Sequence, residues 1–350
     1  MKVGIIGASG YVGGEVIRIL SLHEKVDVVC ATSRNFSGEY VFRVHPNLRG
    51  TTELKFSDPQ PDQIISQCDT IISTVPHGES VKILPQFVES GIKIIDLSAD
   101  FRLRNCEDYE KWYGYQHPHP ELLEKFVYGV PELHRSSLRN AQLVACPGCM
   151  AVTSILALSP FVKNNLIDRD RIVVDSKIGS SGGGVKPSLG THHAERYGVV
   201  RPYKPVGHRH TAEIEQELGI LADNKVTISM SPHAVNIVRG ILCTIHVFPK
   251  KNMNISEVWK TLRGFYKNEP FIRFIRDYKG LYRYPDPKIL VGSNFCDIGF
   301  EIDEHANRLV LLSATDNLVK GAAGSAVQCL NVISGFDEKT GLRDPGLHPA

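Results

Sequence analysis

Two cysteines separated by Pro-Gly, Cys146 and Cys149, are the residues of this chain with the clearest chemical potential. Such a pair can form a redox switch or half of a zinc site, whereas a single thiol can act as a nucleophile. No other CxxC and no HxxxH occurs, which disfavours zinc. The apolar run after Cys149 predicts a helix whose first turn holds this thiol, where the helix dipole favours a thiolate. We therefore expect Cys149 to be a lone nucleophile and Cys146 to be buried and inert; the alternative is that Cys149 is a small core residue.

Two histidines in "GHRHTAE", His208 and His210, are candidates for acid–base catalysis. An imidazole titrates near neutral pH, as proton transfer to and from a reacting group requires. The alternative is a pair of surface histidines beside a helix capped by Thr211. The adjacent His192 and His193 lack a second ligand pair nearby, so no metal site is predicted.

A glycine turn, "GASGYVGG", follows the first predicted strand and opens a helix, with Gly7, Gly10 and Gly13 spaced GxxGxxG. Glycines there allow a tight turn and close approach of the backbone to a phosphate, and the helix N-terminus supplies N–H donors. The pattern therefore predicts a dinucleotide site. A tight turn that binds nothing is the alternative.

The second predicted strand ends in "CATSRN", which bears on the choice of cofactor. Thr32, Ser33 and Arg34 stand there without the carboxylate usual in an NAD site. A hydroxyl beside a guanidinium suits a 2′-phosphate, so NADP is favoured over NAD. A surface arginine in a loop is the alternative.

Three other segments offer groups for an anion or a nicotinamide. "GSSGGG" (179–184) carries hydroxyls and backbone N–H groups, unless it is only a mobile loop. Arg102 can bind phosphate or carboxylate bidentately, unless it pairs with Asp100. "TVPHG" (74–78), at a strand end, is predicted to line the nicotinamide pocket, with a capping role as the alternative for His77. The predicted anion site comprises Arg102, Ser180, Ser181 and Gly182, and the nicotinamide pocket includes Pro76 and Gly78.

The bulk properties limit the class of protein. A chain of 350 residues is long enough for about two domains. The net charge of +2 is too small to suggest nucleic acid as the main partner, and no apolar run approaches the ~20 residues that span a bilayer. The N-terminus lacks a signal peptide, and the eight scattered cysteines suit a reducing compartment. We therefore expect a cytoplasmic protein without a membrane or nucleic-acid partner.

The first half alternates buried strands with helical stretches. Near-continuous apolar runs at 2–7, 26–32, 69–76 and 91–98 read as strands, and 11–22 and 78–90 can form crossover helices. This alternation predicts an α/β fold with a doubly wound, Rossmann-type NADP-binding domain.

After Cys149 the pattern changes to strands with few helices between them. Such strands are predicted at 171–179, 224–235, 239–249, 294–303 and 308–317, and a helix at 254–268 capped by Ser256. This half is predicted to be an α+β substrate and dimerisation domain with a mostly antiparallel sheet. A final helix at 318–334 is expected to fold back, which gives an NADP-binding domain of 1–148 with 318–350 returning, and a catalytic and oligomerisation domain of 149–317.

Seven motifs occur in one order across nearly the whole chain: "GASGYVGGE", "LSADFRL", "YGVPEL", "CPGC", "DSKIGSSGGG", "GHRHTAEIEQEL" and "DNLVKGAAGSA". Together they closely resemble the N-acetyl-γ-glutamyl-phosphate reductase family, which is related to aspartate-semialdehyde dehydrogenases. The resemblance implies NADPH-dependent reduction of an acyl phosphate to an aldehyde through a thioester on Cys149, in a homodimer or homotetramer. It favours His210, directly before a threonine at a helix start, over His208 as the acid–base residue. It implies cofactor contacts from Gly7, Ser9, Gly10, Tyr11, Val12, Gly13, Thr32, Ser33, Arg34, Asn35 and Asn317.

Two segments depart from the usual family pattern. Met150-Ala151-Val152 replaces the common Tyr-Pro-Thr after the nucleophile, at positions expected to pack rather than react. Residues 191–213 instead resemble the branch whose substrate is attached to a small acidic amino-group carrier protein. That branch reduces carrier-linked 2-aminoadipyl phosphate for lysine synthesis, and carrier-linked glutamyl phosphate for arginine.

A basic cluster supports the carrier-linked substrate. Residues 186–210 hold five Lys or Arg and four His against one acid, Glu195. A free acetylated substrate needs fewer cations than an acidic carrier, and a basic surface would speed the encounter. An ordinary basic loop beside an anionic substrate is the alternative. Other readings are the reductase of free N-acetylglutamyl phosphate, an aspartyl-phosphate reductase, an NADP(H)-binding redox sensor that uses Cys146 and Cys149, and a structural zinc protein.

Overall fold

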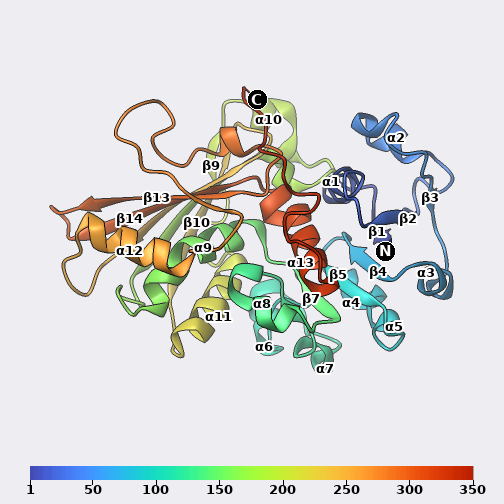
Figure 1. Cartoon of the computed structure of the whole chain (residues 1–350), viewed down its shortest axis with the longest axis horizontal. Helices are drawn as coiled ribbons and strands as arrows, with labels where there is room; N and C mark the ends of the chain where they lie inside the picture. Colours follow the sequence, from blue (N-terminus) through green and yellow to red (C-terminus); the bar gives the residue numbers. More distant parts are fainter. Residues whose placement is uncertain (350) are drawn as a thin grey trace. The chain divides into compact units, whose positions relative to one another are not determined.

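The computed structural model describes residues 1–349, which form two compact units (Figure 1). Unit 1 comprises Met1–Pro147 and Ala322–Asp344, and unit 2 comprises Gly148–Gly321 and the residues from Pro345. The helix predicted at 318–334 is present as a π-helical turn (Val319–Ala323) followed by α13 (Gly324–Ser334). α13 belongs to unit 1, whereas the chain from Pro345 groups with unit 2 and not with the returning segment as predicted.

Unit 1 is built on one seven-stranded parallel sheet in the order β3-β2-β1-β4-β5-β7-β6. Its strands are short and largely buried, as near-continuous apolar runs require. The sheet confirms the doubly wound, Rossmann-type prediction. The strands are β1 (Lys2–Ile6), β2 (Asp27–Thr32), β3 (Phe56–Ser57), β4 (Thr70–Ser73), β5 (Lys93–Asp96), β6 (Val127–Tyr128) and β7 (Leu143–Ala145).

The helices of unit 1 join consecutive parallel strands. α1 begins right after the glycine turn, and the predicted crossover at 78–90 consists of two short helices, since Pro85 interrupts it. The helices are α1 (Tyr11–Leu20), α2 (Val41–Val44), α3 (Pro61–Gln67), α4 (Ser80–Ile83), α5 (Pro85–Val88), α6 (Glu107–Tyr113), α7 (Pro120–Leu123) and α8 (Pro131–Leu138), with a 3-10 turn at Pro46–Leu48.

Unit 2 holds a seven-stranded mixed sheet in the order β12-β13-β14-β11-β8-β10-β9. Only the β8–β10 and β12–β13 neighbours are parallel, so the sheet is mostly antiparallel, as predicted. The strands are β8 (Ile172–Ile178), β9 (Val200–Pro202), β10 (Ile228–Val235), β11 (Ile241–Val247), β12 (Ile272–Phe274), β13 (Cys296–Asp303) and β14 (Arg308–Thr315).

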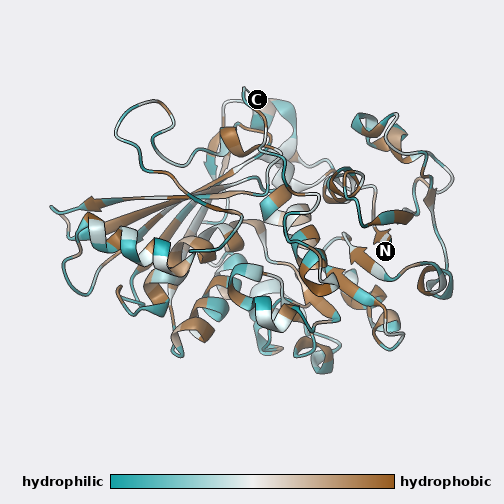
Figure 2. Ribbon diagram, in the orientation of Figure 1, coloured by the Kyte–Doolittle hydropathy of each residue, from teal (hydrophilic) through white to brown (hydrophobic). Residues whose placement is uncertain are grey.

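One face of this sheet packs on α9 (Cys149–Lys163), which is buried from Met150 to Val162 and contacts β11 and β14. α9 also contacts α11 (His210–Ala222) and α12 (Ile255–Phe265). Figure 2 shows α12 in alternating hydrophilic and hydrophobic bands, as expected of a helix with one apolar face. The cap of α12 is Asn254 and not Ser256 as predicted, because the Asn254 side chain accepts from Glu257 N–H and Glu257 bonds back to Asn254 N–H.

A long exposed segment, residues 182–207, interrupts unit 2 between β8 and α11 and is called the basic arm below. It contains α10 (His193–Arg196), a 3-10 turn (Leu189–Thr191) and the edge strand β9 (Figure 1). Among residues 1–349, none of the helices is both long and apolar enough to cross a bilayer.

Candidate active site

Cys149 is the first residue of α9, and Gly148 occupies the N-cap position without a side-chain cap. The first turn of this 15-residue helix carries no acidic residue, so the positive end of its dipole acts on the thiol unopposed within the helix. Cys149 is partly exposed, whereas Cys146 is fully buried, as expected for a reactive and an inert thiol respectively.

Two glycines in unit 2 leave room around Cys149. A Cβ on Gly321 would lie 2.7 Å from the Cys149 Cβ. A Cβ on Gly148 would lie 2.5 Å from His210 Nε2 and 2.8 Å from Glu213 Oε1. The imidazole of His210 therefore packs against the backbone immediately before the thiol.

His210 is the first residue of α11, and both it and Glu213 are buried. His210 Nε2 lies 4.0 Å from Glu213 Oε1, and Glu213 Oε2 accepts a hydrogen bond from Gly148 N–H at 2.8 Å. Glu213 was not among the site residues predicted from the sequence. A signal was present, because residues three apart on a helix share a face.

His208 precedes α11 and is also buried, and its ring stands edge-on to that of His210 with centroids 4.7 Å apart. Its Nδ1 accepts a hydrogen bond from His210 N–H at 3.2 Å. Burial, with Arg209 and Lys204 nearby, lowers the pKa of His208 to about 4. His208 is therefore neutral near pH 7. α11 begins at His210 with Arg209 as its N-cap, so Thr211 lies inside the first turn and does not cap it.

Tyr203, in the basic arm, is a second residue near the thiol that was not predicted from the sequence. Its hydroxyl lies 4.0 Å from Met150 Sδ, and its ring stands edge-on to that of His208. Desolvation, and then the charge of a nearby Cys149 thiolate, raise the pKa of Tyr203 to about 12, although 45% of the Tyr203 surface is exposed. A protonated phenol thus lies close to the thiol, in a position that no local pattern in the sequence indicated.

The predicted anion turn, "GSSGGG", forms a 3-10 helix (Ser180–Gly183) after β8. Five of its backbone N–H groups, those of Gly179, Ser180, Ser181, Gly182 and Gly184, already donate within unit 2, which leaves few for a phosphate. The Ser181 hydroxyl donates to Val238 O at 2.6 Å and accepts from Asn317 Nδ2 at 2.9 Å. The role of Ser180, Ser181 and Gly182 at an anion stays a prediction.

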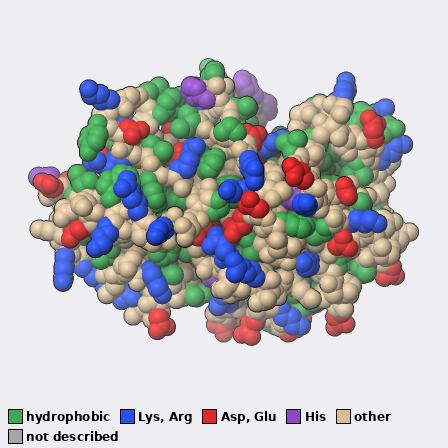
Figure 3. Space-filling model, in the orientation of Figure 1, with side chains coloured by type: hydrophobic (Ala, Val, Ile, Leu, Met, Phe, Trp, Pro, Cys, Tyr) green, Lys and Arg blue, Asp and Glu red, His purple; other side chains and the backbone are tan. Residues whose placement is uncertain are grey.

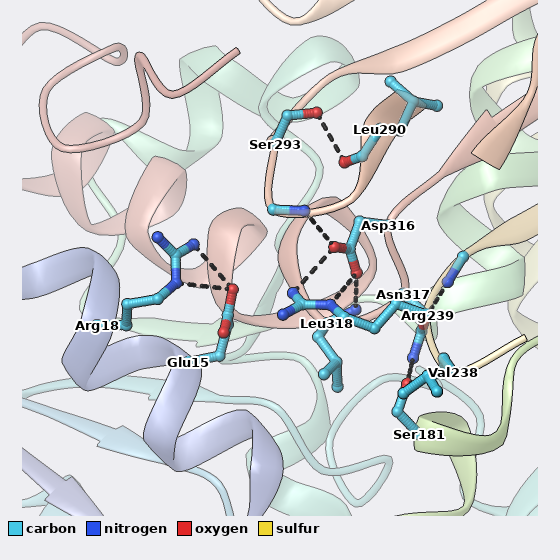
Figure 4. Close-up of polar contacts among 12 residues, drawn as sticks. Glu15, Arg18, Ser181, Val238, Arg239, Leu290, Ser293, Asp316, Asn317 and Leu318 are labelled. Carbon is cyan, nitrogen blue, oxygen red and sulfur yellow. Dashed lines mark hydrogen bonds and ion pairs between the residues drawn. The ribbon is translucent and has the colours of Figure 1, made fainter. Parts of the chain in front are cut away.

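Asn317 and Asp316 anchor that turn to the end of β14. The Asn317 side chain bonds both Ser181 and Gly240 N–H, and the buried Asp316 carboxylate pairs with Arg239 at 2.9 Å (Figure 4). Asp316 also accepts from the N–H groups of Gly292 and Leu318. Asn317 is therefore held rigidly, and its proposed contact with the cofactor stays a prediction.

The glycine turn lies in unit 1, where the geometry fits a dinucleotide phosphate. Gly7 has a φ of +79°, and a Cβ on Gly13 would lie 2.6 Å from Ala8, so neither position admits a side chain. Gly10 meets only a carbonyl at 3.9 Å, which leaves open space above the turn. α1 has no side-chain cap and no acid in its first turn, so its N-terminus, including the predicted contact residues Tyr11 and Val12, can receive an anion. The Glu15–Arg18 pair of Figure 4 lies one turn further along α1.

The end of β2 is bonded to this turn. Gly7 N–H donates to Thr32 Oγ1 at 3.1 Å, and the Ser33 hydroxyl donates to that of Ser9 at 3.0 Å. Arg34 and Asn35 follow and are exposed. The structure therefore brings the predicted cofactor residues of both segments together.

The turn after β4 carries Pro76, which is exposed, and Gly78, whose φ is +80°. Arg102 is buried near the end of β7, where Nε donates to Cys146 O at 2.7 Å and an Nη donates to Leu97 O at 2.8 Å. These bonds fix the guanidinium, and its role at an anion stays a prediction.

Two family models match nearly the whole chain: "Semialdehyde dehydrogenase, NAD binding domain" at residues 2–141, and "Semialdehyde dehydrogenase, dimerisation domain" at residues 149–317. Unit 1 is therefore a domain for a nicotinamide cofactor. Solved structures share the fold: aspartate semialdehyde dehydrogenase II of Vibrio cholerae (TM-score 0.72, 19% identity, 95% of this chain and 98% of that chain) and the Candida albicans enzyme with NADP (TM-score 0.68, 14% identity, 95% and 98%).

Relatives in sequence are much closer. A protein of Sulfurisphaera tokodaii named [LysW]-L-2-aminoadipate/[LysW]-L-glutamate phosphate reductase is 48% identical over 350 residues, covering 100% of both chains. A protein of Nitrosopumilus maritimus, which carries this name with a provisional qualifier, is 59% identical over 349 residues, again covering 100% of both. The chain therefore belongs to the [LysW]-L-2-aminoadipate/[LysW]-L-glutamate phosphate reductases of the semialdehyde dehydrogenase family, an NAD(P)-dependent group of oxidoreductases, as the seven motifs had indicated.

Proposed function

We propose that this chain uses NADPH to reduce an acyl phosphate, attached to a small acidic carrier protein, to a semialdehyde through a thioester on Cys149. The acyl group is 2-aminoadipyl, glutamyl or both, because one methylene changes binding by only about 1–3 kcal/mol. The observation that carries the proposal is the packing of His210 and Glu213 against Gly148, directly before a partly exposed thiol at a helix N-terminus. The carrier is inferred from the relatives, whose names include LysW.

The chemistry balances with groups of this chain and one cofactor. The Cys149 thiolate attacks the carbonyl carbon, a C–S bond forms, and the C–O bond to phosphate breaks with its electron pair leaving on phosphate. The nicotinamide, when bound, supplies a hydride to the thioester carbon. The C–S bond then breaks, which releases the aldehyde and restores the thiolate.

His210 is the proposed proton carrier, and His208 is a neighbour that supports it. His210 accepts the thiol proton before attack, and the Glu213 carboxylate stabilises the imidazolium that results. His208 has a pKa near 4 and so holds no extra proton to donate at neutral pH. Its neutral ring instead accepts from the His210 backbone.

The preference for NADP over NAD rests on the end of β2. No carboxylate stands among Thr32, Ser33, Arg34 and Asn35, and the exposed Arg34 is free to pair with a 2′-phosphate. Arg34→Ala should lower kcat/KM for NADPH about tenfold or more and leave that for NADH nearly unchanged. If the ratio of kcat/KM for NADPH to kcat/KM for NADH did not change, another residue would be responsible for the preference for NADP.

The basic arm is the proposed surface for the carrier. Nearly all of residues 182–207 are exposed, including several large apolar side chains such as Leu189 (79%) and Val206 (78%). An apolar surface of this kind marks a protein interface rather than a small-molecule site. Its cations Lys186 and Lys204 form no ion pair within residues 1–349, and its only acid, Glu195, faces Arg201 at 3.8 Å. Elsewhere, over the face drawn in Figure 3, Lys and Arg are interspersed with Asp and Glu.

The test compares two aldehydes in the reverse reaction, phosphate-dependent reduction of NADP⁺. One is free N-acetylglutamate semialdehyde, and the other is aminoadipate or glutamate semialdehyde attached to an acidic carrier. Turnover confined to the carrier-linked aldehyde, and weakened by salt, supports the proposal. Efficient turnover of the free acetylated aldehyde would contradict the proposal and indicate that the protein is a reductase of free N-acetylglutamyl phosphate.

A charge-reversal pair sharpens this test. Lys186→Glu with Lys204→Glu should raise the KM for the carrier-linked aldehyde about tenfold or more, with kcat little changed. Lys260→Glu with Lys279→Glu makes the same change in net charge at exposed sites outside the basic arm and should have little effect. If both double variants raised the KM for the carrier-linked aldehyde equally, the net charge of the protein, and not a docking surface on the basic arm, would explain the effect.

Assembly and location complete the proposal. Residues 149–317 match the dimerisation domain of the family, and we propose that they form the contact of a homodimer or homotetramer in the cytoplasm. Sedimentation equilibrium of the full chain tests the assembly, and a monomer at micromolar concentration would exclude it.

A further inference from the structure

The Asp100 carboxylate lies just beyond the end of β5, beside the turn that follows the neighbouring strand β4. Asp100 is fully buried. Gly78 N–H donates to its two oxygens at 2.7 and 3.0 Å, Val81 N–H donates at 3.1 Å, and the Tyr115 hydroxyl donates at 3.1 Å. The Asp100 carboxylate therefore accepts hydrogen bonds from two backbone N–H groups, at the end of this turn and in the helix after it, and from one hydroxyl.

No Lys or Arg side chain pairs with Asp100 among residues 1–349, although a buried carboxylate usually has such a partner. Its charge is balanced by backbone N–H and hydroxyl donors instead. Such charge-assisted hydrogen bonds are about twice as strong as neutral ones. An amide in its place would turn an NH₂ group toward N–H donors and leave them unsatisfied.

The turn that Asp100 holds, residues 74–79, is also attached at its other end. The Thr74 hydroxyl donates to Ile6 O and Gly7 O, both at 3.0 Å, and the Val75 side chain fills the space that a Cβ on Gly7 would need. The turn is thus fixed on one side to the glycine turn and on the other to Asp100. Gly78 adopts its φ of +80° between these two attachments.

We propose that Asp100 is a positioning residue for the nicotinamide cofactor, because it holds the turn 74–79 in the form that receives the cofactor. The inference rests on the proposed function. Ligands of doubly wound sheets bind beyond the carboxyl ends of the strands, where this turn and the glycine turn both lie. A turn held beforehand spares the cofactor the cost of ordering it.

The first test is Asp100→Asn, with NADPH affinity measured by fluorescence titration. The variant should bind NADPH about tenfold more weakly. The rate at which iodoacetamide alkylates Cys149 should not change, because that thiol lies in unit 2. When the NADPH is deuterated at C4, the primary isotope effect on turnover should be larger in the variant than in the wild type. Loss of a residue that only stabilises the fold would not raise this isotope effect. Wild-type affinity and isotope effect in a folded variant would overturn the proposal.

Tyr115→Phe is the matched control. It removes the hydroxyl donor and leaves both backbone N–H bonds to Asp100, so NADPH affinity should stay within about threefold of wild type. If Tyr115→Phe lost as much NADPH affinity as Asp100→Asn, the tyrosine hydroxyl would be responsible for the loss. The proposal that Asp100 acts by holding the turn 74–79 would then be overturned.

If Asp100→Asn does not fold, hydrogen exchange of the wild type decides instead. The Gly78 and Val81 amides should be protected before any cofactor is added, and exchange at the rate of unstructured amides would overturn the proposal. A wild type that binds neither NADPH nor NADH would refute the proposed function and the role of Asp100 with it, whereas a wild type that binds NADPH but leaves the Gly78 and Val81 amides unprotected would refute the role of Asp100 alone. The two failures are therefore distinguishable.

Discussion

Glu213 connects His210 to the backbone before Cys149. One carboxylate oxygen lies 4.0 Å from His210 Nε2, and the other accepts from Gly148 N–H at 2.8 Å. Both side chains are buried, where the electrostatic interaction of a carboxylate with an imidazolium is stronger than in water. The position of His210, the proposed acid–base residue, relative to the thiol is thus linked to a carboxylate that need not touch the substrate.

Glu213→Gln tests this relationship. The amide oxygen can still accept from Gly148, but the charge beside His210 is lost, so kcat should fall about 10- to 100-fold with KM little changed. Steady-state kinetics of the reverse reaction measure both constants. Glu257→Gln, an exposed cap residue of α12, should leave kcat unchanged. A kcat within twofold of wild type in Glu213→Gln would show that the charge has no part in proton transfer.

Gly148→Ala should displace His210 and Glu213 together. The new Cβ would lie 2.5 Å from His210 Nε2, closer than van der Waals contact allows. We expect kcat to fall about tenfold or more, with NADPH affinity retained because the cofactor domain is untouched. Gly264→Ala, where a Cβ meets nothing within 4 Å, is the control and should remain fully active. Full activity of Gly148→Ala would mean that the imidazole can move without consequence.

Cys149→Ser should abolish turnover, by about 10⁴-fold or more, since a serine hydroxyl is a far weaker nucleophile than a thiolate. Cys146→Ser should retain activity, because Cys146 is fully buried and a buried thiol is not expected to react. Mass spectrometry of the acylated enzyme locates the thioester. Loss of activity in a folded Cys146→Ser variant would restore the reading in which the two cysteines act as a redox pair.

The stability of the fold should depend on the charge of His208. Its pKa of about 4 in the folded chain lies below the ordinary value of 6.5, so the unfolded chain binds the proton more tightly. The contribution is therefore fully present above pH 6.5 and is lost as the pH falls toward 4, by on the order of 3 kcal/mol. Urea unfolding at several pH values should show a steeper loss for the wild type than for His208→Gln. Parallel curves for the two proteins would contradict this origin of the pH dependence.

The sequence by itself determined the local features of this protein. Apolar runs predicted the longer strands of both sheets but not the strands of two or three residues (β3, β6, β7, β9 and β12), and the glycine turn predicted the start of α1, because backbone geometry and periodicity are encoded by neighbouring residues. Pro-Gly before an apolar run placed Cys149 at the start of α9. The order of seven motifs indicated the family that the relatives established.

Tertiary structure decided which of these segments meet. Gly148 and Glu213 are 65 positions apart, Ser181 and Asn317 are 136 apart, and Gly78 lies 22 positions from Asp100. Such pairs are set by strand order, as when β8 lies between β10 and β11, and this order follows from the packing of whole apolar faces and not from any local pattern. The neighbours that the fold gives to the predicted site residues, such as Tyr203 beside His208 and Gly148 beside Glu213, could therefore be recognised only after the chain had folded.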